Sequence, residues 1–413
     1  MSSQPRLRSQ RALATAPLRR PFSQWRVRTA AVTIAAALAF LTITTTSFAT
    51  VGSVYWDTSG NAAAGGNLFN GTFSGTGNVG LGRNVMNSLT SGSDNSAIGA
   101  GALDSVTSGS DNIANGFQAL FSNGTGSSNI ASGRFALQFN TSGNDNIATG
   151  TNALRNNTTG NENEATGTNT LQSNTTGTDN VATGIDALNA NTTGNGNIAT
   201  GTNALGSNTT GHDNVAYGGV SLFRNKTGTD NVAAGSLALF ANTAGNDNIA
   251  TGIAALFSNT GSRNVATGSD ALENNAGASN NTAIGFDALL NSTGGANLAL
   301  GSGAGKNLTT GSTNVDIANP GVAGESGTIR IGTAFQKAAY LAGVWNKTAP
   351  GPTKAVVINK NGRLATGPAP AAPVSAQAQA VSRLRAALHK QRMDNRRQDA
   401  AIQRLQREVR AGG

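Results

Sequence analysis

The chain has 413 residues, no cysteine, 54 glycines, 12% charged and 5% aromatic residues, which excludes disulfide staples and thiolate metal sites. One compact domain of this length would need many more large apolar side chains than this composition supplies. The net charge of +9 comes from the two ends of the chain: residues 1–29 have seven Arg and no acid, and residues 374–413 have nine basic and three acidic residues. The middle therefore has a net charge of 9 − 7 − 6 = −4. An acidic segment is not expected to bind nucleic acid.

The N-terminus has the pattern of an export signal. A basic region precedes an apolar run from Ala30 to Ile43, and the small-residue site Ser47-Phe48-Ala49 follows. An apolar run of about 14 residues is short for a membrane span. We therefore expect residues 1–49 to be a signal peptide removed before Thr50, with an uncleaved anchor helix as the alternative. Residues 50–77 are expected to cap the segment that follows.

Residues 78–311 repeat with a period of 17. A repeat glycine recurs from Gly82 to Gly252 in steps of 17 and continues to Gly301, with Asn four residues before it and, in most units, Leu four residues after it. Ile or Val usually stands three residues before the repeat glycine, and a second glycine seven before. Seventeen residues cannot bury an apolar face alone, so the units must stack.

This pattern predicts an all-β repeat protein, a parallel β-solenoid of about fourteen coils. We expect the β-branched residues and the leucines to point inward as two ladders, the glycines to permit positive φ at the corners, and the corner asparagines to adopt the left-handed region and bond to one another along the stack. Two short strands per coil are expected, with a short helical turn around Asn-Ala-Leu as the alternative, because Ala and Leu are weak strand formers. The predicted core ladder is Leu103, Leu120, Leu137, Leu154, Leu188, Leu205, Leu222, Leu239 and Leu256.

The segment after the repeats, residues 312–366, is expected to be a β-rich connector. Thr328-Ile329-Arg330-Ile331 and Ala339-Tyr340-Leu341-Ala342 have the composition of strands. Residues 354–364 are typical of a hairpin that turns at Asn359-Lys360-Asn361-Gly362. A Pro/Ala linker over residues 367–373 then interrupts regular structure.

Residues 374–413 are predicted to form a helical coiled coil. Alternating steps of three and four residues define its a and d positions, and three polar layers lie between apolar ends. Such polar layers cost stability and specify register and the number of strands. A lone amphipathic helix is the alternative. The predicted coiled-coil core consists of Val381, Leu384, Leu388, Gln391, Asn395, Gln398, Ile402, Leu405 and Val409.

The repeat unit resembles a known family. Asn-Ser-Ala-Ile-Gly at 95–99 and Asn-Thr-Ala-Ile-Gly at 281–285 resemble the head repeats of YadA-type trimeric adhesins, whose heads are left-handed parallel β-rolls of three chains. The 17-residue form resembles bacterial and phage proteins of tail-fibre type, and residues 319–332 are similar to the stretch that joins their repeats to a C-terminal intramolecular chaperone. The resemblance spans about residues 78–370 and implies a homotrimer.

Two departures from the family limit what the resemblance implies. After Gly367 the sequence has a coiled-coil pattern in place of a chaperone domain, and it has no run of amphipathic strands for an outer-membrane barrel. Self-cleavage and autotransport are therefore not expected, and we predict no integral membrane barrel.

We expect no enzyme activity, no cofactor and no metal. Neither His212 nor His389 has a partner at a recognisable catalytic spacing. Glycan hydrolysis would need two carboxylates about 5–10 Å apart across one groove, and the local acid pair, Glu162 and Glu164, lies in a single degenerate unit. A column of Asp five residues before the repeat glycine has two interpretations, a calcium ladder and, more simply, a row of turn residues.

Thr and Phe columns also have two interpretations each. Thr149, Thr166 and their equivalents form a row that either binds ice or, more simply, is ordinary strand surface. Seven phenylalanines around the leucines fill the core or form a seam between chains, with an exposed stripe for a partner as the alternative. The predicted function is a secreted or cell-surface, adhesin-like homotrimeric fibre whose ligand is a surface glycan or a host or matrix component. A phage-tail-fibre-like polysaccharide binder is the alternative.

Overall fold

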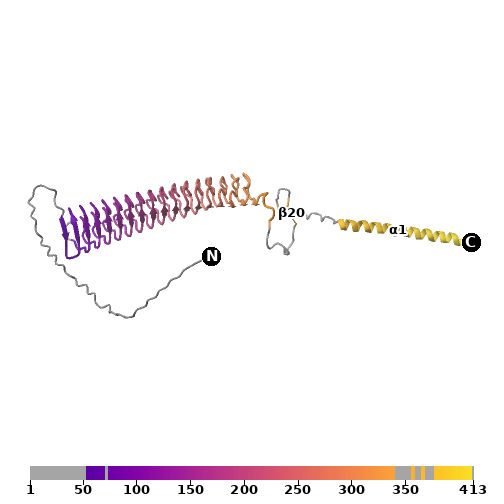
Figure 1. Cartoon of the computed structure of the whole chain (residues 1–413), viewed down its shortest axis with the longest axis horizontal. Helices are drawn as coiled ribbons and strands as arrows, with labels where there is room; N and C mark the ends of the chain where they lie inside the picture. The colour runs from indigo at the N-terminus through magenta and orange to yellow at the C-terminus, as the bar shows by residue number, and fades with distance from the viewer. Residues whose placement is uncertain (1–52, 70–72, 340–354, 359–363, 368–375, 412–413) are drawn as a thin grey trace, which may run out of the picture. The chain divides into compact units, whose positions relative to one another are not determined.

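The computed structural model describes residues 53–69, 73–339, 355–358, 364–367 and 376–411 (Figure 1). It divides into two units between Thr333 and Ala334. The predicted signal peptide 1–49 and residues 368–373 of the predicted linker lie outside the described residues. In the part of the chain that is described, no helix is both long and apolar enough to cross a membrane.

The first unit is one long sheet wound as a parallel β-solenoid. Strand β1 (Ser53–Trp56) pairs antiparallel with β2 (Ala62–Gly65), and from β2 to β18 each strand pairs in parallel with the next one along the chain. The later strands are β3 (Val79–Leu81), β4 (Ser96–Ile98), β5 (Ile113–Asn115), β6 (Ile130–Ser132), β7 (Ile147–Thr149), β8 (Glu164–Thr166), β9 (Val181–Thr183), β10 (Ile198–Thr200), β11 (Val215–Tyr217), β12 (Val232–Ala234), β13 (Ile249–Thr251), β14 (Val265–Thr267), β15 (Thr282–Ile284), β16 (Leu298–Leu300), β17 (Val315–Ile317) and β18 (Ile329–Ile331).

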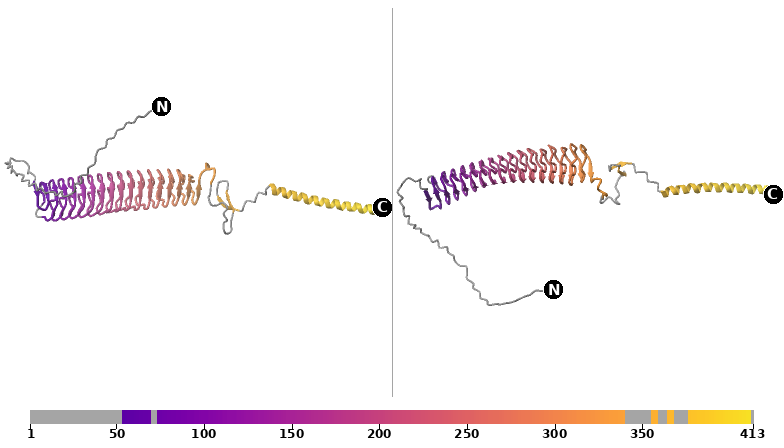
Figure 2. Two further views of the ribbon diagram at one scale, coloured as in Figure 1. Left: turned by 60° about the horizontal axis from the view of Figure 1, so that its bottom comes forward. Right: turned by 45° about the horizontal axis from the view of Figure 1, so that its top comes forward.

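The predicted solenoid is confirmed, and its ladder is longer than the predicted range 78–311. Strand β2 starts the parallel ladder before residue 78, and β18 continues it after residue 311. The segment Thr328-Ile329-Arg330-Ile331, expected in a separate connector, therefore supplies the last rung of the solenoid. Figure 2 shows the same regular stacking from two further directions.

Each coil of the described solenoid contains one strand, so the expectation of two strands per coil is wrong. The strand has three residues in β3 to β18, and hydrogen-bonded turns complete the coil. The segment around Asn-Ala-Leu is such a turn: the Ala153 amide donates to the Gly150 carbonyl and the Asn157 amide to the Leu154 carbonyl. Leu154 has a φ of 50°, as do its equivalents in neighbouring coils, so the turn is left-handed at the leucine rather than helical.

The core is narrower than predicted, because the β-branched residues point outward. A three-residue strand has one inward position, its middle one, and Ala fills it in most coils. In β7, Ala148 is fully buried while Ile147 is 39% exposed. The expectation of an inward β-branched ladder is therefore wrong. The nine leucines of the predicted core ladder are fully buried against these alanines.

The repeat glycine is required by both conformation and space. Gly150 has a φ of 131°, and a Cβ at this position would lie 2.4 Å from the carbonyl oxygen of Gly167 in the next coil. An L-residue is strained at this φ and would also push the coils apart. This glycine therefore sets how closely consecutive coils approach.

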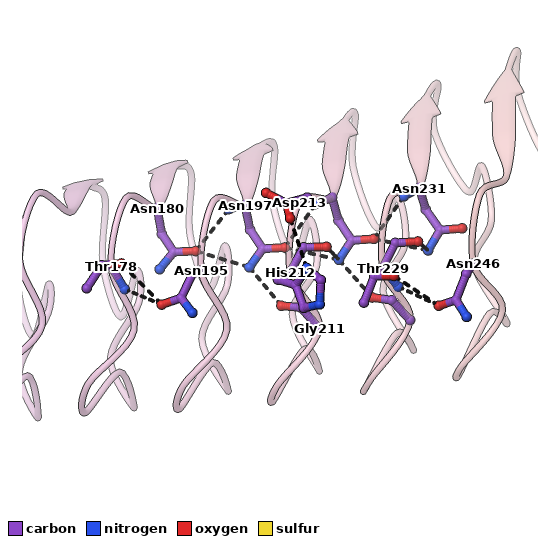
Figure 3. Close-up of polar contacts among 12 residues, drawn as sticks. Thr178, Asn180, Asn195, Asn197, Gly211, His212, Asp213, Thr229, Asn231 and Asn246 are labelled. Carbon is purple, nitrogen blue, oxygen red and sulfur yellow. Dashed lines mark hydrogen bonds and ion pairs between the residues drawn. The ribbon is translucent and has the colours of Figure 1, made fainter.

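A ladder of buried asparagines joins the coils on the inner side of the strands (Figure 3). Asn197 donates from its backbone amide and from Nδ2 to the Oδ1 of Asn180, at 3.0 and 3.1 Å, and Nδ2 also donates to the Gly211 carbonyl at 2.9 Å. Each amide group is thus satisfied by its neighbours, as the predicted Asn stacking requires. The left-handed conformation belongs to the preceding residue, such as Asp179 with a φ of 59°, and not to the asparagine as predicted.

A second asparagine ladder, not predicted, runs through the turns. Asn174 donates from Nδ2 to Asn157 Oδ1 at 2.8 Å and to the Gly177 carbonyl at 2.9 Å. These residues are the asparagines of the recurring Asn-Thr-Thr sequons, and both are fully buried. The folded coil therefore has no room for a glycan at these positions.

The second unit contains a hairpin and a helix. Strands β19 (Ala355–Ile358) and β20 (Leu364–Gly367) pair antiparallel, which agrees with the predicted hairpin, whose turn lies outside the described residues. Helix α1 (Ala376–Ala411) occupies the predicted coiled-coil segment as one unbroken helix. Within Ala339-Tyr340-Leu341-Ala342, only Ala339 is described, and it is not in a strand.

We predict that Asn197→Ala destabilises the solenoid by about 2–4 kcal/mol, because the buried Asn214 backbone amide loses its acceptor, Asn197 Oδ1. Asn180 Oδ1 and the Gly211 carbonyl each lose one of two hydrogen bonds. The free energy of unfolding from denaturant titration checks this value. Asn195→Ala, in an exposed row of the same coil, is the control and should cost less than about 1 kcal/mol. Equal losses in the two variants would contradict a structural role for the buried ladder.

Candidate functional site

The solenoid presents one continuous surface, the outer sheet face, formed by the first and third residues of strands β3 to β18. Parallel in-register pairing places equivalent residues directly beside one another, for example Ile147, Glu164 and Val181. The first column is mostly Ile and Val, with Ile198 44% and Ile249 43% exposed. It consists of Val79, Ser96, Ile113, Ile130, Ile147, Glu164, Val181, Ile198, Val215, Val232, Ile249, Val265, Thr282, Leu298, Val315 and Ile329.

The third column of the outer sheet face changes character along the solenoid. It is apolar near both ends and rich in threonine in the middle, where Tyr217 and Ala234 interrupt the threonines. The column consists of Leu81, Ile98, Asn115, Ser132, Thr149, Thr166, Thr183, Thr200, Tyr217, Ala234, Thr251, Thr267, Ile284, Leu300, Ile317 and Ile331. The threonines therefore share their face with an apolar column, which favours ordinary strand surface over a flat threonine array.

This face has the chemistry of a contact surface. Soluble monomers rarely expose an apolar patch of more than a few hundred Å². Here apolar side chains that are 36–49% exposed recur along most of the first column, from Val79 to Leu298. Their aligned, β-branched shapes suit packing against another regular surface. Polar residues interrupt the column at Ser96, at the exposed Glu164 and at Thr282.

The seven phenylalanines lie in turns rather than in strands, and five of them are half-buried, whereas Phe117 and Phe139 are 45% and 40% exposed. The rings of Phe223, Phe240 and Phe257 stack along the coils with centroid separations of 5.7 and 5.1 Å. They occupy the turn position after the buried leucine, and Arg224 lies 5.1 Å from the Phe240 ring. A second group pairs Phe117 with Phe135 at 5.5 Å. The stack of Phe223, Phe240 and Phe257 is half-buried, so these rings add aromatic contacts between consecutive coils.

The candidate acid and histidine residues are dispersed. His212 Nδ1 lies 2.9 Å from Asp213 Oδ2, and both side chains are exposed (Figure 3). The Asp column to which Asp213 belongs adopts positive φ, so it consists of turn residues. Glu162 sits in the same turn position, whereas Glu164 points outward from β8, and both are exposed. Within the described residues, no group of three or more His, Cys, Asp or Glu is arranged to hold a metal ion.

One carboxyl group lies inside the solenoid, and sequence reasoning missed it. Asp316 occupies the inward position of β17, where the strands from β2 to β16 have Ala or Gly, and it is fully buried. After Leu289, the leucine position of the following coil is occupied by Gly305. A Cβ on Gly305 would lie 3.4 Å from Asp316 Oδ2. A Cβ at Gly321 would lie 2.9 Å from the same oxygen. Two glycines thus leave space for this carboxyl group. In the sequence, the replacement of the expected Ala by Asp in Val315-Asp316-Ile317 indicates a buried acid.

An ion pair covers this end of the core. Arg330, the register partner of Asp316 in β18, donates from Nε to both oxygens of Glu325, at 2.8 and 2.9 Å, and from Nη2 to Oε2 at 2.7 Å. This hydrogen bonding lowers the pKa of Glu325 and raises that of Arg330. Burial raises the pKa of Asp316 to about 6, with a further increase from the charge of Glu325 and a decrease from that of Arg330. Neither Asp316 oxygen has a hydrogen-bond partner.

Helix α1 exposes its heptad seam completely. All of the predicted coiled-coil core residues are exposed on this helix, with Leu384 at 69% and Val409 at 75%. The predicted seam therefore forms one apolar stripe, interrupted in the middle by Gln391, Asn395 and Gln398. His389 lies outside the seam and is also exposed.

We predict that Asp316→Asn stabilises the solenoid above pH 6. Because folding raises the pKa of Asp316 from its ordinary value of 3.8 to about 6, its contribution is most favourable below pH 3.8 and is lost as the pH rises through 6. The variant should therefore gain on the order of 2 kcal/mol over the wild type between about pH 4 and pH 8. Unfolding titrations at both pH values measure this difference, and Asp247→Asn, at an exposed turn, should show none.

Comparisons with known proteins leave the family open. No protein-family model matches this chain, and no curated protein matches it significantly. The function must therefore be argued from the outer sheet face, the helix seam and the N-terminal sequence.

Proposed function

We propose that this protein is a non-enzymatic, exported surface fibre that assembles as a homotrimer and presents a repetitive, adhesin-like binding surface. The observation that carries the proposal is the exposed outer sheet face, whose first column is apolar in most coils. The basic, apolar and small-residue order of residues 1–49 supports export. The resemblance of the repeat to trimeric adhesin heads supports the number of chains.

The energetics of the outer sheet face favour association of whole chains. Burying the exposed half of one Ile or Val is worth roughly 1 kcal/mol. The entropic cost of association is about 4–15 kcal/mol. The summed burial energy of about a dozen such residues in the first column exceeds most of this range, but only if many coils are in contact at once. A second copy of the same solenoid, aligned in parallel, offers the same column at the same spacing, which a globular partner does not.

The seam of α1 supports the same arrangement. Identical parallel helices would bring each apolar position against its equivalent, so Val381 and Leu384 near one end and Leu405 and Val409 near the other would be covered. The polar layers at Gln391, Asn395 and Gln398 would then specify a common register. A common register in the helices also aligns the coils of the solenoids, because each chain has the same length between the two.

The assembled fibre is suited to multivalent binding. Outside the contact face, the solenoid repeats exposed or half-exposed Ser, Thr, Asn and Asp side chains along its coils, as in the row that contains Thr178, Asn195 and Thr229. Weak contacts at one coil are multiplied by the number of coils and chains. A surface glycan or a matrix polymer with its own repeat is the kind of ligand that such rows would bind.

We predict that the protein from residue 50 onward has three times the subunit mass by light scattering. Deletion of residues 374–413 should weaken the assembly, because the helices contribute part of the contact. A monomer for the undeleted chain at micromolar concentration would refute the trimer. A trimer that survives the deletion would assign the association to the outer sheet face alone.

We further predict that Ile198→Lys combined with Ile249→Lys raises the dissociation constant of the trimer at least tenfold, because each substitution places a charge in the contact face. Light scattering over a dilution series measures the effect. Thr193→Lys combined with Ala244→Lys is the matched control, since these residues are exposed in the same two coils, five residues earlier. Equal dissociation in both variants would mean that the outer sheet face is not the contact.

A further inference from the structure

Helix α1 carries a second feature that the trimer does not use, a regular basic stripe. Arg383, Lys390, Arg397 and Arg404 recur every seven residues and are all exposed. If the seam residues are a and d, these four occupy the c position, which faces solvent in a coiled coil of any strand number. At 1.5 Å per residue the charges lie about 10.5 Å apart and span about 32 Å. We call them the outer helix stripe.

The acids of α1 all lie beside the seam, where Arg385 and Arg392 also lie, and none lies on the outward positions. The outward positions b, c and f also hold Arg396, Arg407 and Arg410, and they hold no acid. The three acids, Asp394, Asp399 and Glu408, occupy positions e and g beside the seam. An ordinary solvated helix face mixes both signs. One exposed ion pair, Arg397 with Asp394 at 3.9 Å, links the stripe to its flank, and pairs of this kind contribute little.

The segment that contains the solenoid has the opposite charge. Residues 53–339 contain nine basic and 17 acidic residues, a balance of −8, whereas residues 376–411 contain nine basic and three acidic residues, a balance of +6. An anionic partner is therefore attracted to α1 and repelled by the solenoid. This separation favours a role in attachment over general solubility, for which one sign throughout would suffice.

We propose that the outer helix stripe binds a linear, phosphate-bearing polymer of the cell envelope and so attaches the fibre by its helical end. This inference rests on the proposed function, because three helices in a bundle would present three such stripes around one rod. A flexible polymer can follow all three stripes, whereas a flat bilayer meets one or two.

Two observations select this partner among anionic ones. The b, c and f positions of α1 have no Trp, Phe or Leu, and Met393 is their one large apolar residue. Interfacial membrane helices insert such residues into the lipid, so a bilayer is disfavoured. The export-type N-terminus places the chain away from cytoplasmic nucleic acid. We take phosphate diesters in a polymer chain as the ligand, because three of the four stripe residues are Arg, which binds phosphate oxygens through bidentate hydrogen bonds.

The test measures binding of the full mature chain to poly(glycerol phosphate) over a range of salt concentrations. The test variant replaces Arg383, Lys390, Arg397 and Arg404 by Gln. We expect it to bind about 10- to 100-fold more weakly near 100 mM salt and to show a shallower dependence of log K on log salt, because fewer counterions are released. Light scattering on the same samples reports the strand number, so loss of the trimer is distinguished from loss of the polymer site.

A matched control removes four charges from the solenoid. Arg83, Lys226, Arg263 and Lys306 are exposed, and their replacement by Gln lowers the net charge by the same amount. This control should retain wild-type affinity. Equal weakening in both variants, or no binding by the wild type, would overturn the proposal. Tighter binding to phosphatidylglycerol vesicles or to duplex DNA than to poly(glycerol phosphate) would also overturn it, by assigning the stripe to those partners.

Discussion

The structure depends on amide side chains that are satisfied only by the neighbouring coil. In the inner ladder, Asn180 Oδ1 accepts two hydrogen bonds from Asn197, and Asn197 Nδ2 also donates to the Gly211 carbonyl, all away from water. Most coils repeat this pattern. A buried amide without these partners is costly, so one coil has no stable structure alone. The ladder forms at only one spacing and register between coils. The repeat glycine allows that same spacing, because a Cβ at Gly150 would lie 2.4 Å from a carbonyl oxygen of the next coil.

That spacing determines which surfaces the protein has. With one three-residue strand per coil, Ala and Leu suffice to fill the interior, and the larger Ile and Val side chains are displaced to the outside. Because the register is constant, displaced residues form columns rather than scattered patches. The apolar column of the outer sheet face and the seam of α1 are two unsatisfied surfaces in one chain. The proposed trimer satisfies both with the same partner, which is why it explains more than a heterologous ligand would.

The C-terminal end of the solenoid departs from this regularity. Asp316 replaces Ala, Gly305 replaces Leu, and Arg330 lies across the end of the core with Glu325 as its partner. Each change would be unfavourable in the middle of the stack, where a carboxylate would lack any counter-charge. Together they end the apolar core with the Arg330–Glu325 ion pair. They also leave one buried carboxyl group, Asp316, at this end of the solenoid. Beyond it, the chain changes from an acidic to a basic composition, so the solenoid segment and the helix have opposite net charges.

The amino-acid sequence by itself determined the solenoid, its period, the buried leucines, the stacked inner asparagines and the helical heptads of α1. Each of these follows from local spacing, which stacking of equal units preserves. The tertiary structure decided which side of the strand faces inward. A pattern of Ile-Ala-Thr allows either face to be buried, and only the width of the closed coil selects Ala over Ile. The same closure placed Leu154 in a left-handed turn, buried Asn157 of the sequon and isolated Asp316, because none of these outcomes is contained in the propensity of a single residue.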